Sequence, residues 1–188
     1  MAISLRLPAR LTDEDIRDLA ARNPGLQIEQ AASGELILTP TGAEAGRREV
    51  ALGAQLYNWA IARGTGHTFG PSTGFRLPDG SLRSPDASWV RRDRWEALSP
   101  AEREGFAPLC PDAVFEIRSR SHPLSDLRDK MRAYLANGAR LAVLIDPHRR
   151  AAEVYEPGRD PQVRERAETV ALDPVLPGFT LDLKPIFE

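Results

Sequence analysis

Two acidic residues occupy polar positions in segments that otherwise have the pattern of core strands. Asp86 lies in SPDASWV and Glu116 in DAVFEIRS, and apolar residues alternate with both. If the two strands are neighbours, the carboxylates converge, and two carboxylates about 4 Å apart repel by about 4 kcal/mol at an effective dielectric constant of about 20. They then need a proton, a basic side chain or a divalent cation between them, and oxygen ligands alone favour Mg²⁺ or Mn²⁺ over zinc.

Asp112 shares one strand face with Glu116, but an extended strand separates the two by about 13 Å. The two residues therefore cannot bind one ion. We expect Asp112, which follows Pro111 at the strand entrance, to be solvated or to act as a capping residue.

Lys130 is the third residue that could do chemistry. It follows the Glu116 strand on a predicted helix, at the edge of an apolar stripe, so its ammonium can reach toward the sheet. Five further side chains could form a basic rim that binds phosphates. They are Arg118, Arg120, His122, Arg128 and Arg132.

The three main candidates also have purely structural explanations. Glu116 could be a wet-face residue paired with Arg118 or Lys130, Asp86 a strand cap after proline, and Lys130 a helix-edge lysine with its head in water. Spacing alone does not decide between the structural and the chemical explanation.

The elements that must position these residues follow from periodicity and turn signals. The clearest is a β-α-β unit, in which a helix within 125–138 connects strands at 112–119 and 139–147 and makes those strands parallel. The remaining expectations are a helix in 11–25, a hairpin in 26–40 around Ser33-Gly34, a long helix in 43–64, short strands in 67–90 with a turn at Asp79-Gly80, two short helices in 91–106, and short closing strands.

Capping residues support the helix assignments. Thr12 and Asp15 have the spacing of a capping box, and Gly64 ends the long helix. We expect Ser125 to cap the helix that carries Lys130, and Asn137-Gly138 to end it.

Composition restricts the class of protein. The chain has 188 residues, 41% hydrophobic and 28% charged, which is enough for one domain with a core that needs no disulfide. No apolar run approaches the ~20 residues of a membrane helix, the first residues do not resemble a secretory signal, and Cys110 stands alone, so we expect a cytoplasmic protein with no membrane partner. The net charge of −2 excludes bulk electrostatic coating of nucleic acid, but not a local basic groove.

Several separated blocks resemble, in the same order, the Uma-type family of restriction endonuclease-like proteins, a branch of the PD-(D/E)XK nuclease superfamily. The resemblance runs from about residue 35 to the C-terminus. The blocks are TPTGAEAGRRE, STGFRLPDGSLRSPDASWV, PDAVFEIRS, LSDLRDKMRAYLANGARLAVLIDP, VYEPG and VLPGFTLDL.

The resemblance implies an α/β fold with a mixed sheet: a restriction-endonuclease-like core flanked by helices, plus peripheral hairpins. It implies a single domain over residues 1–188, to which residues 1–34 add a helix and a first strand as an extension. It also implies divalent-metal hydrolysis of DNA, with Asp86 and Glu116 as the motif acids, and these two residues and the carbonyl of Ile117 as ligands of Mg²⁺ or Mn²⁺. Glu44 is a weaker candidate for a further acidic ligand through water, and Glu49 ranks below it.

One position departs from the superfamily pattern. Arg118 stands where the pattern has lysine, and arginine neither gives up its proton readily nor replaces a compact ammonium. Some superfamily members supply the lysine from the following helix, so we assign this catalytic role to Lys130, with Arg118 as the alternative.

Three functions therefore remain at this point. The first is a metal-dependent endonuclease, for which a homodimer would suit cutting of both DNA strands. The second is an inactive nuclease-fold protein that binds nucleic acid or a protein partner. The third is a glycoside hydrolase with paired carboxylates, which the low aromatic content of 6% disfavours.

Overall fold

The computed structural model describes residues 3–120 and 122–188, which form three β-sheets and six helices. The helices are α1 (Asp13–Arg22), α2 (Ala43–Arg63), α3 (Arg92–Glu96), α4 (Pro100–Glu104), α5 (Leu124–Ala136) and α6 (Lys184–Phe187). The strands are β1 (Ile3–Leu5), β2 (Leu26–Gln30), β3 (Leu36–Pro40), β4 (Gly66–Phe69), β5 (Phe75–Arg76), β6 (Leu82–Arg83), β7 (Ala87–Arg91), β8 (Ala113–Ile117), β9 (Leu141–Asp146), β10 (Ala151–Tyr155), β11 (Gln162–Glu165), β12 (Thr169–Ala171) and β13 (Thr180–Asp182). None of the described helices is both long enough and apolar enough to span a membrane.

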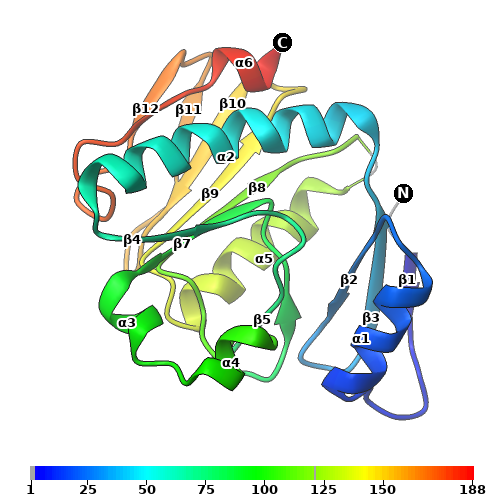
Figure 1. Ribbon diagram of the computed structural model, residues 1–188. Helices are drawn as coiled ribbons and strands as arrows, with labels where there is room; N and C mark the ends of the chain where they lie inside the picture. The colour runs from blue at the N-terminus through cyan, green and yellow to red at the C-terminus, as the bar shows by residue number, and fades with distance from the viewer. Residues whose placement is uncertain (1–2, 121) are drawn as a thin grey trace.

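A six-stranded mixed sheet forms the centre of the fold, in the order β11-β10-β9-β8-β7-β4 (Figure 1). Only β8 and β9 pair in parallel, and α5 connects them. Every residue of β9 is buried, as expected for a strand covered on both faces. The predicted β-α-β unit and the mixed α/β fold are confirmed.

Two layers cover the central sheet. The long helix α2, together with β12, β13 and α6, packs on one face through a core that includes Leu56, Trp59 and Phe115. Helix α5 packs on the other face, where Met131 and Leu144 are fully buried. Because β8 lies near the middle of the sheet, its alternate residues face α2 and α5 in turn.

A second, five-stranded sheet has the order β1-β3-β2-β6-β5 and lies beside the first (Figure 1). It combines the predicted hairpin at Ser33-Gly34 with the β5-β6 hairpin at Asp79-Gly80, and α1 packs on it through Ile16. Both side chains of the predicted Thr12/Asp15 capping box make their hydrogen bonds. The N-terminal segment is thus tied by β-pairing to residues just before Asp86.

One local expectation was wrong, and another held only in part. Helix α5 starts at Leu124 after Pro123 and has no side-chain cap, because Ser125 lies within the first turn, where its hydroxyl bonds to Asp126 instead. Asp112, expected to be solvated or to act as a cap, is not solvated, since it is 1% exposed. Its carboxylate instead caps the backbone N–H of Arg91 and pairs with Arg94. Asp112 therefore joins β8 to the β7-α3 junction.

Glu153 is a buried acid on β10, two strands away from β8 in the central sheet. Its carboxylate pairs with Arg128 at 2.6 Å and Arg149 at 3.3 Å, and accepts a hydrogen bond from the Tyr155 hydroxyl at 2.6 Å. Burial alone would raise the pKa of Glu153, but the hydrogen bonds from Arg128 and Tyr155 outweigh burial and lower that pKa.

We predict that Glu153→Gln lowers the free energy of unfolding by about 1–2 kcal/mol near neutral pH. The expected loss of stability is modest because Arg128 is more than a third exposed, so solvent screens its ion pair with Glu153. Since the folded-state pKa is lowered, this stabilisation is complete above about pH 5 and is lost as the pH falls through the folded-state pKa. Urea unfolding of both proteins across this pH range tests the prediction. Glu165→Gln, at an exposed partner of Arg149, is the control, and a difference between wild type and Glu153→Gln that does not shrink in acid would contradict it.

Candidate active site

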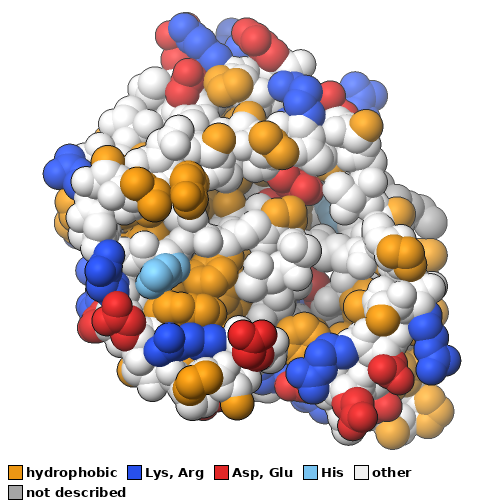
Figure 2. Space-filling model, viewed as in Figure 1, with side chains coloured by type: hydrophobic (Ala, Val, Ile, Leu, Met, Phe, Trp, Pro, Cys, Tyr) orange, Lys and Arg blue, Asp and Glu red, His pale blue; other side chains and the backbone are white. Residues whose placement is uncertain are grey.

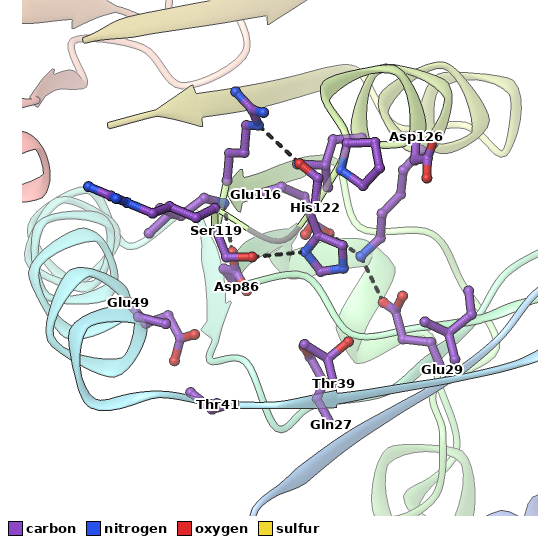
Figure 3. Close-up of a pocket in the computed structure, with 18 of the residues that line it drawn as sticks. Gln27, Glu29, Thr39, Thr41, Glu49, Asp86, Glu116, Ser119, His122 and Asp126 are labelled. Carbon is purple, nitrogen blue, oxygen red and sulfur yellow. Dashed lines mark hydrogen bonds and ion pairs between the residues drawn. The ribbon is translucent and has the colours of Figure 1, made fainter. Parts of the chain in front are cut away.

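A cleft of about 1200 Å³ lies between the two sheets, lined by residues of β2 and β3, the start of α2, the end of β8 and the helix α5 (Figure 3). Asp86, Glu116, Ile117 and Lys130 all line this cleft. Figure 2 shows one face of the molecule, where acidic side chains are visible within a hollow between α2 and the N-terminal sheet. The structure thus brings all the predicted site residues into one cavity.

Antiparallel pairing of β7 with β8 brings the two acids together. Ala87 pairs with Phe115, so Asp86, the residue before β7, lies beside the end of β8. The Oδ2 atom of Asp86 accepts a hydrogen bond from the backbone N–H of Ile117 at 2.6 Å. Asp86 and Glu116, although distant in the sequence, meet at one end of two neighbouring strands.

Glu116 faces α5 and is 5% exposed. Its Oε1 atom accepts a hydrogen bond from the Tyr134 hydroxyl at 2.8 Å and lies 2.7 Å from Nζ of Lys130. Burial raises the pKa of Glu116 even though the charge of Lys130 opposes the shift.

The pKa of Asp86 indicates more strongly than that of Glu116 that negative charge in the cleft lacks compensation. Burial, and next the charge of Glu116, raise the pKa of Asp86 well above its usual range, and the Ile117 N–H and Lys130 only partly oppose this. A divalent cation would supply the missing positive charge.

The donor set fits a hard cation. Asp86 and Glu116 offer carboxylate oxygens, and Ile117 adds a carbonyl at the same strand end. Within the residues that the structure describes, no group of three or more His, Cys, Asp and Glu side chains could hold a metal ion. Two carboxylates suffice for Mg²⁺, which typically keeps several waters and binds substrate phosphate.

Arg118, the alternative to Lys130, is directed elsewhere. Its guanidinium pairs with buried Asp146 at 2.8 Å on the neighbouring strand β9 and donates to the carbonyl of His122 at 3.1 Å. Lys130, by contrast, contacts Glu116 directly. This geometry favours Lys130 for the lysine role.

Two acids of α2 line the cleft, and they differ in their partners. Glu44 pairs with Arg47 at 2.7 Å and Arg48 at 3.0 Å, and the hydrogen bond from Arg47 is the main cause of its lowered pKa. Glu49 points into the cleft (Figure 3), and burial, with the charge of Glu116, raises its pKa. The geometry therefore favours Glu49 over Glu44 as a further acid, the reverse of the sequence-based order.

The predicted basic rim is largely neutralised, because three of its arginines pair with acids, two of which are distant in the sequence. Arg128 binds Glu153, Arg132 binds Asp129, and Arg118 binds Asp146. Arg120 is exposed at the cleft, as the rim hypothesis requires. His122 also lines the cleft, where burial and then Lys130 lower its pKa.

Comparison with known proteins identifies the family. The model of the Uma2 family, described as "Putative restriction endonuclease", matches residues 13–184. The chain belongs to the Uma2 family. The match begins at Asp13, earlier than the expected start near residue 35, and so includes the N-terminal helix and hairpin.

A solved structure has the same fold. A crystal structure described as that of a putative nuclease belonging to DUF820, from Anabaena variabilis ATCC 29413, superposes with a TM-score of 0.73. The alignment covers 94% of this chain and 97% of that chain at 18% sequence identity. No curated protein matches the chain. The Uma2 family and the fold together support a nuclease function in general terms.

The sequence did not single out Glu29, Arg83 or Tyr134, which contact the candidate site residues or one another. Glu29 contacts Lys130 at 2.9 Å and Arg83 at 3.4 Å, and Tyr134 donates to Glu116. A weak signal existed for Glu29, since it occupies a mid-strand position in LQIEQ, as Glu116 does in AVFEI. The ring of Tyr134 packs in the apolar core under α5, but its hydroxyl donates to Glu116.

We predict that Tyr134→Phe lowers the free energy of unfolding by about 1–3 kcal/mol, because Glu116 loses a charge-assisted hydrogen bond in a buried setting. The same loss raises the pKa of Glu116 further, since Tyr134 acts to lower it. Urea unfolding gives the first quantity, and carboxyl NMR of Glu116 gives the second. Tyr155→Phe, which removes the corresponding hydroxyl from Glu153, is the matched control. It should cost similar stability without moving the Glu116 resonance, and an unchanged Glu116 pKa in Tyr134→Phe would contradict the prediction.

Proposed function

We propose that the protein is an endonuclease that hydrolyses DNA phosphodiester bonds with Mg²⁺ or Mn²⁺. The observation that supports this proposal best is the convergence of Asp86, Glu116 and Lys130 in one cleft. Family membership adds to it, because the family description names a restriction endonuclease, an enzyme class that acts on DNA.

In this proposal Asp86, Glu116 and the carbonyl of Ile117 hold the cation. When bound, a divalent cation supplies Lewis-acid polarisation of the scissile phosphate and a more acidic water. Lys130 orients the attacking water and offsets negative charge that develops on the phosphate. Glu49, half-buried on α2, adds an acid at the edge of the site.

The cleft lining argues against a sugar substrate. None of the described lining residues is Phe, Tyr or Trp, so no aromatic platform for stacking on a sugar ring is present among them. Trp59 and Trp89 instead pack on each other in the core, with ring centroids 5.6 Å apart. A glycoside hydrolase is accordingly disfavoured.

The second candidate is a nuclease-fold protein that binds nucleic acid or a protein partner without cutting. Arg118 at the position of the superfamily lysine favours this candidate. The contact between Lys130 and Glu116 favours catalysis instead, and metal-dependent cleavage separates the two.

We expect the purified protein to nick supercoiled plasmid DNA when Mg²⁺ or Mn²⁺ is added. Asp86→Ala and Glu116→Ala should each reduce the rate at least about hundredfold, because each removes a ligand of the cation. Asp129→Ala, at an exposed acid of the same cleft, is the control and should cut normally. Equal nicking by wild type and both site variants would indicate a contaminant and remove the support for catalysis, whereas binding without cleavage would favour the second candidate.

The same assay tests the lysine assignment. Lys130→Ala should abolish cleavage, whereas Arg118→Ala should weaken it mainly through lost stability, since Arg118 neutralises buried Asp146. Loss of cleavage in folded Arg118→Ala, with normal rates in Lys130→Ala, would reverse the assignment.

We further propose that two copies associate, since one site per chain cuts one strand and a duplex has two. The apolar residues Val50, Tyr57 and Ile61 are 71%, 55% and 66% exposed on α2. Beside them β4 is an edge strand of the central sheet, and a hollow of about 240 Å³ joins the two elements. Figure 2 shows apolar side chains gathered over this part of the molecule. An apolar helix face next to an open strand edge suits a symmetric pair of identical surfaces.

Sedimentation velocity is expected to give a dimer for the wild-type protein. Tyr57→Glu combined with Ile61→Glu should give a monomer, because two charges would then lie in the apolar contact. Val163→Glu, at an exposed apolar residue on the opposite edge strand β11, serves as the control and should remain dimeric. A monomeric wild-type protein at the concentrations used for cleavage would contradict the dimer.

A further inference from the structure

Glu29 is a buried acid that the N-terminal sheet contributes to the cleft. It is 6% exposed on β2, and its side chain accepts a hydrogen bond from the backbone N–H of Ser84 at 2.8 Å. Arg83 lies 3.4 Å away and Lys130 2.9 Å away. These contacts fix the Glu29 carboxylate from several directions.

Lys130 therefore lies between two carboxylates from different sheets. Its ammonium is 2.7 Å from Oε1 of Glu116 and 2.9 Å from Oε1 of Glu29. Only one of these two acids belongs to the proposed set of cation ligands. The Lys130 side chain is only 15% exposed, so its ammonium has little contact with bulk water.

A cation on Glu116 would compete with the Lys130 ammonium, because both are attracted to the same carboxylate. Like charges at close range also repel one another, and a lysine stem has enough rotatable bonds to move away. A second carboxylate that takes no part in cation binding would keep the ammonium in place. Glu29 meets this requirement by position and by its own hydrogen bonds.

We propose that Glu29 is a positioning residue that retains the ammonium of Lys130 in the cleft while Glu116 binds the cation. This inference rests on the proposed nuclease function for its catalytic meaning. It gives the N-terminal sheet a role in the chemistry, since β2 supplies the second anchor of the lysine. A purely structural Glu29 would instead serve only to neutralise Arg83.

The lysine content of the chain permits a direct test that needs no catalysis. The sequence contains only two lysines, Lys130 and Lys184, so protein labelled with ¹⁵N-lysine should give at most two side-chain ammonium signals. Lys184 is 55% exposed and pairs with Glu168 at the surface, so it serves as an internal reference.

In wild type, addition of Mg²⁺ should shift the Lys130 signal without abolishing it. In Glu29→Gln the same addition should broaden the Lys130 signal beyond detection, because the ammonium loses its remaining anchor. Glu35→Gln, at a partly exposed acid of the same hairpin, should behave as wild type. A Lys130 signal that responds to Mg²⁺ identically in wild type and Glu29→Gln would overturn the inference. Because this readout does not require cleavage, it decides the inference even if the protein cuts no DNA.

Kinetics give the second readout. Glu29→Gln should lower kcat about tenfold to hundredfold with little change in KM for DNA, because substrate contacts remain while the lysine is misplaced. Glu29→Asp keeps the charge beside Arg83 but shortens the reach to Lys130, so it should fold like wild type and still lose part of kcat. An unchanged kcat in both variants, or a fall that only follows lost thermal stability, would show that Glu29 acts through folding alone.

Discussion

The structure is constrained by a group of buried carboxylates that has too few cationic partners. Asp86, Glu116 and Glu29 lie around one cleft, and Lys130 is the cation that touches two of them. Burying acids without compensation is costly, and the raised pKa values of Asp86 and Glu116 are the expression of that cost. Lys130, Arg83 and the Tyr134 hydroxyl offset part of that cost through their contacts with Glu116 and Glu29.

The arrangement of strands explains why the charges meet where they do. Parallel pairing of β8 with β9 requires a crossover, and the crossover helix α5 delivers Lys130 and Tyr134 to the face of β8 that carries Glu116. Antiparallel pairing of β7 with β8 delivers Asp86 to the end of the same strand. Strand β8 thus meets a polar side chain from the start of β7 and two from the helix α5.

Local signals in the sequence predicted much of this fold. The capping box of α1, the hairpin turns, the glycine end of α2 and the β-α-β unit all depend on residues close in the chain, and the structure confirms them. The Ser125 cap failed because a preceding proline and Asp126 offered an alternative that spacing alone does not rank. The convergence of Asp86, Glu116 and Lys130 was expected because the family resemblance supplied their relative positions, and all three line one cleft.

The partners of charged residues were the least predictable feature. Glu29 meets Lys130, and Glu153 meets Arg128, only because separate elements pack together, and no periodicity encodes such encounters. For the same reason the basic rim was overestimated, since tertiary contacts set the partners of Arg118 and Arg128.

Those internal pairings also bear on how nucleic acid would associate with the protein. A guanidinium already matched to Glu153, Asp146 or Asp129 has little charge left to displace condensed counterions from a phosphate backbone. Binding would then release few ions, and its affinity would fall only gently as ionic strength rises. Recognition would depend more on the shape of the cleft, and on the cation that we propose it binds, than on long-range attraction.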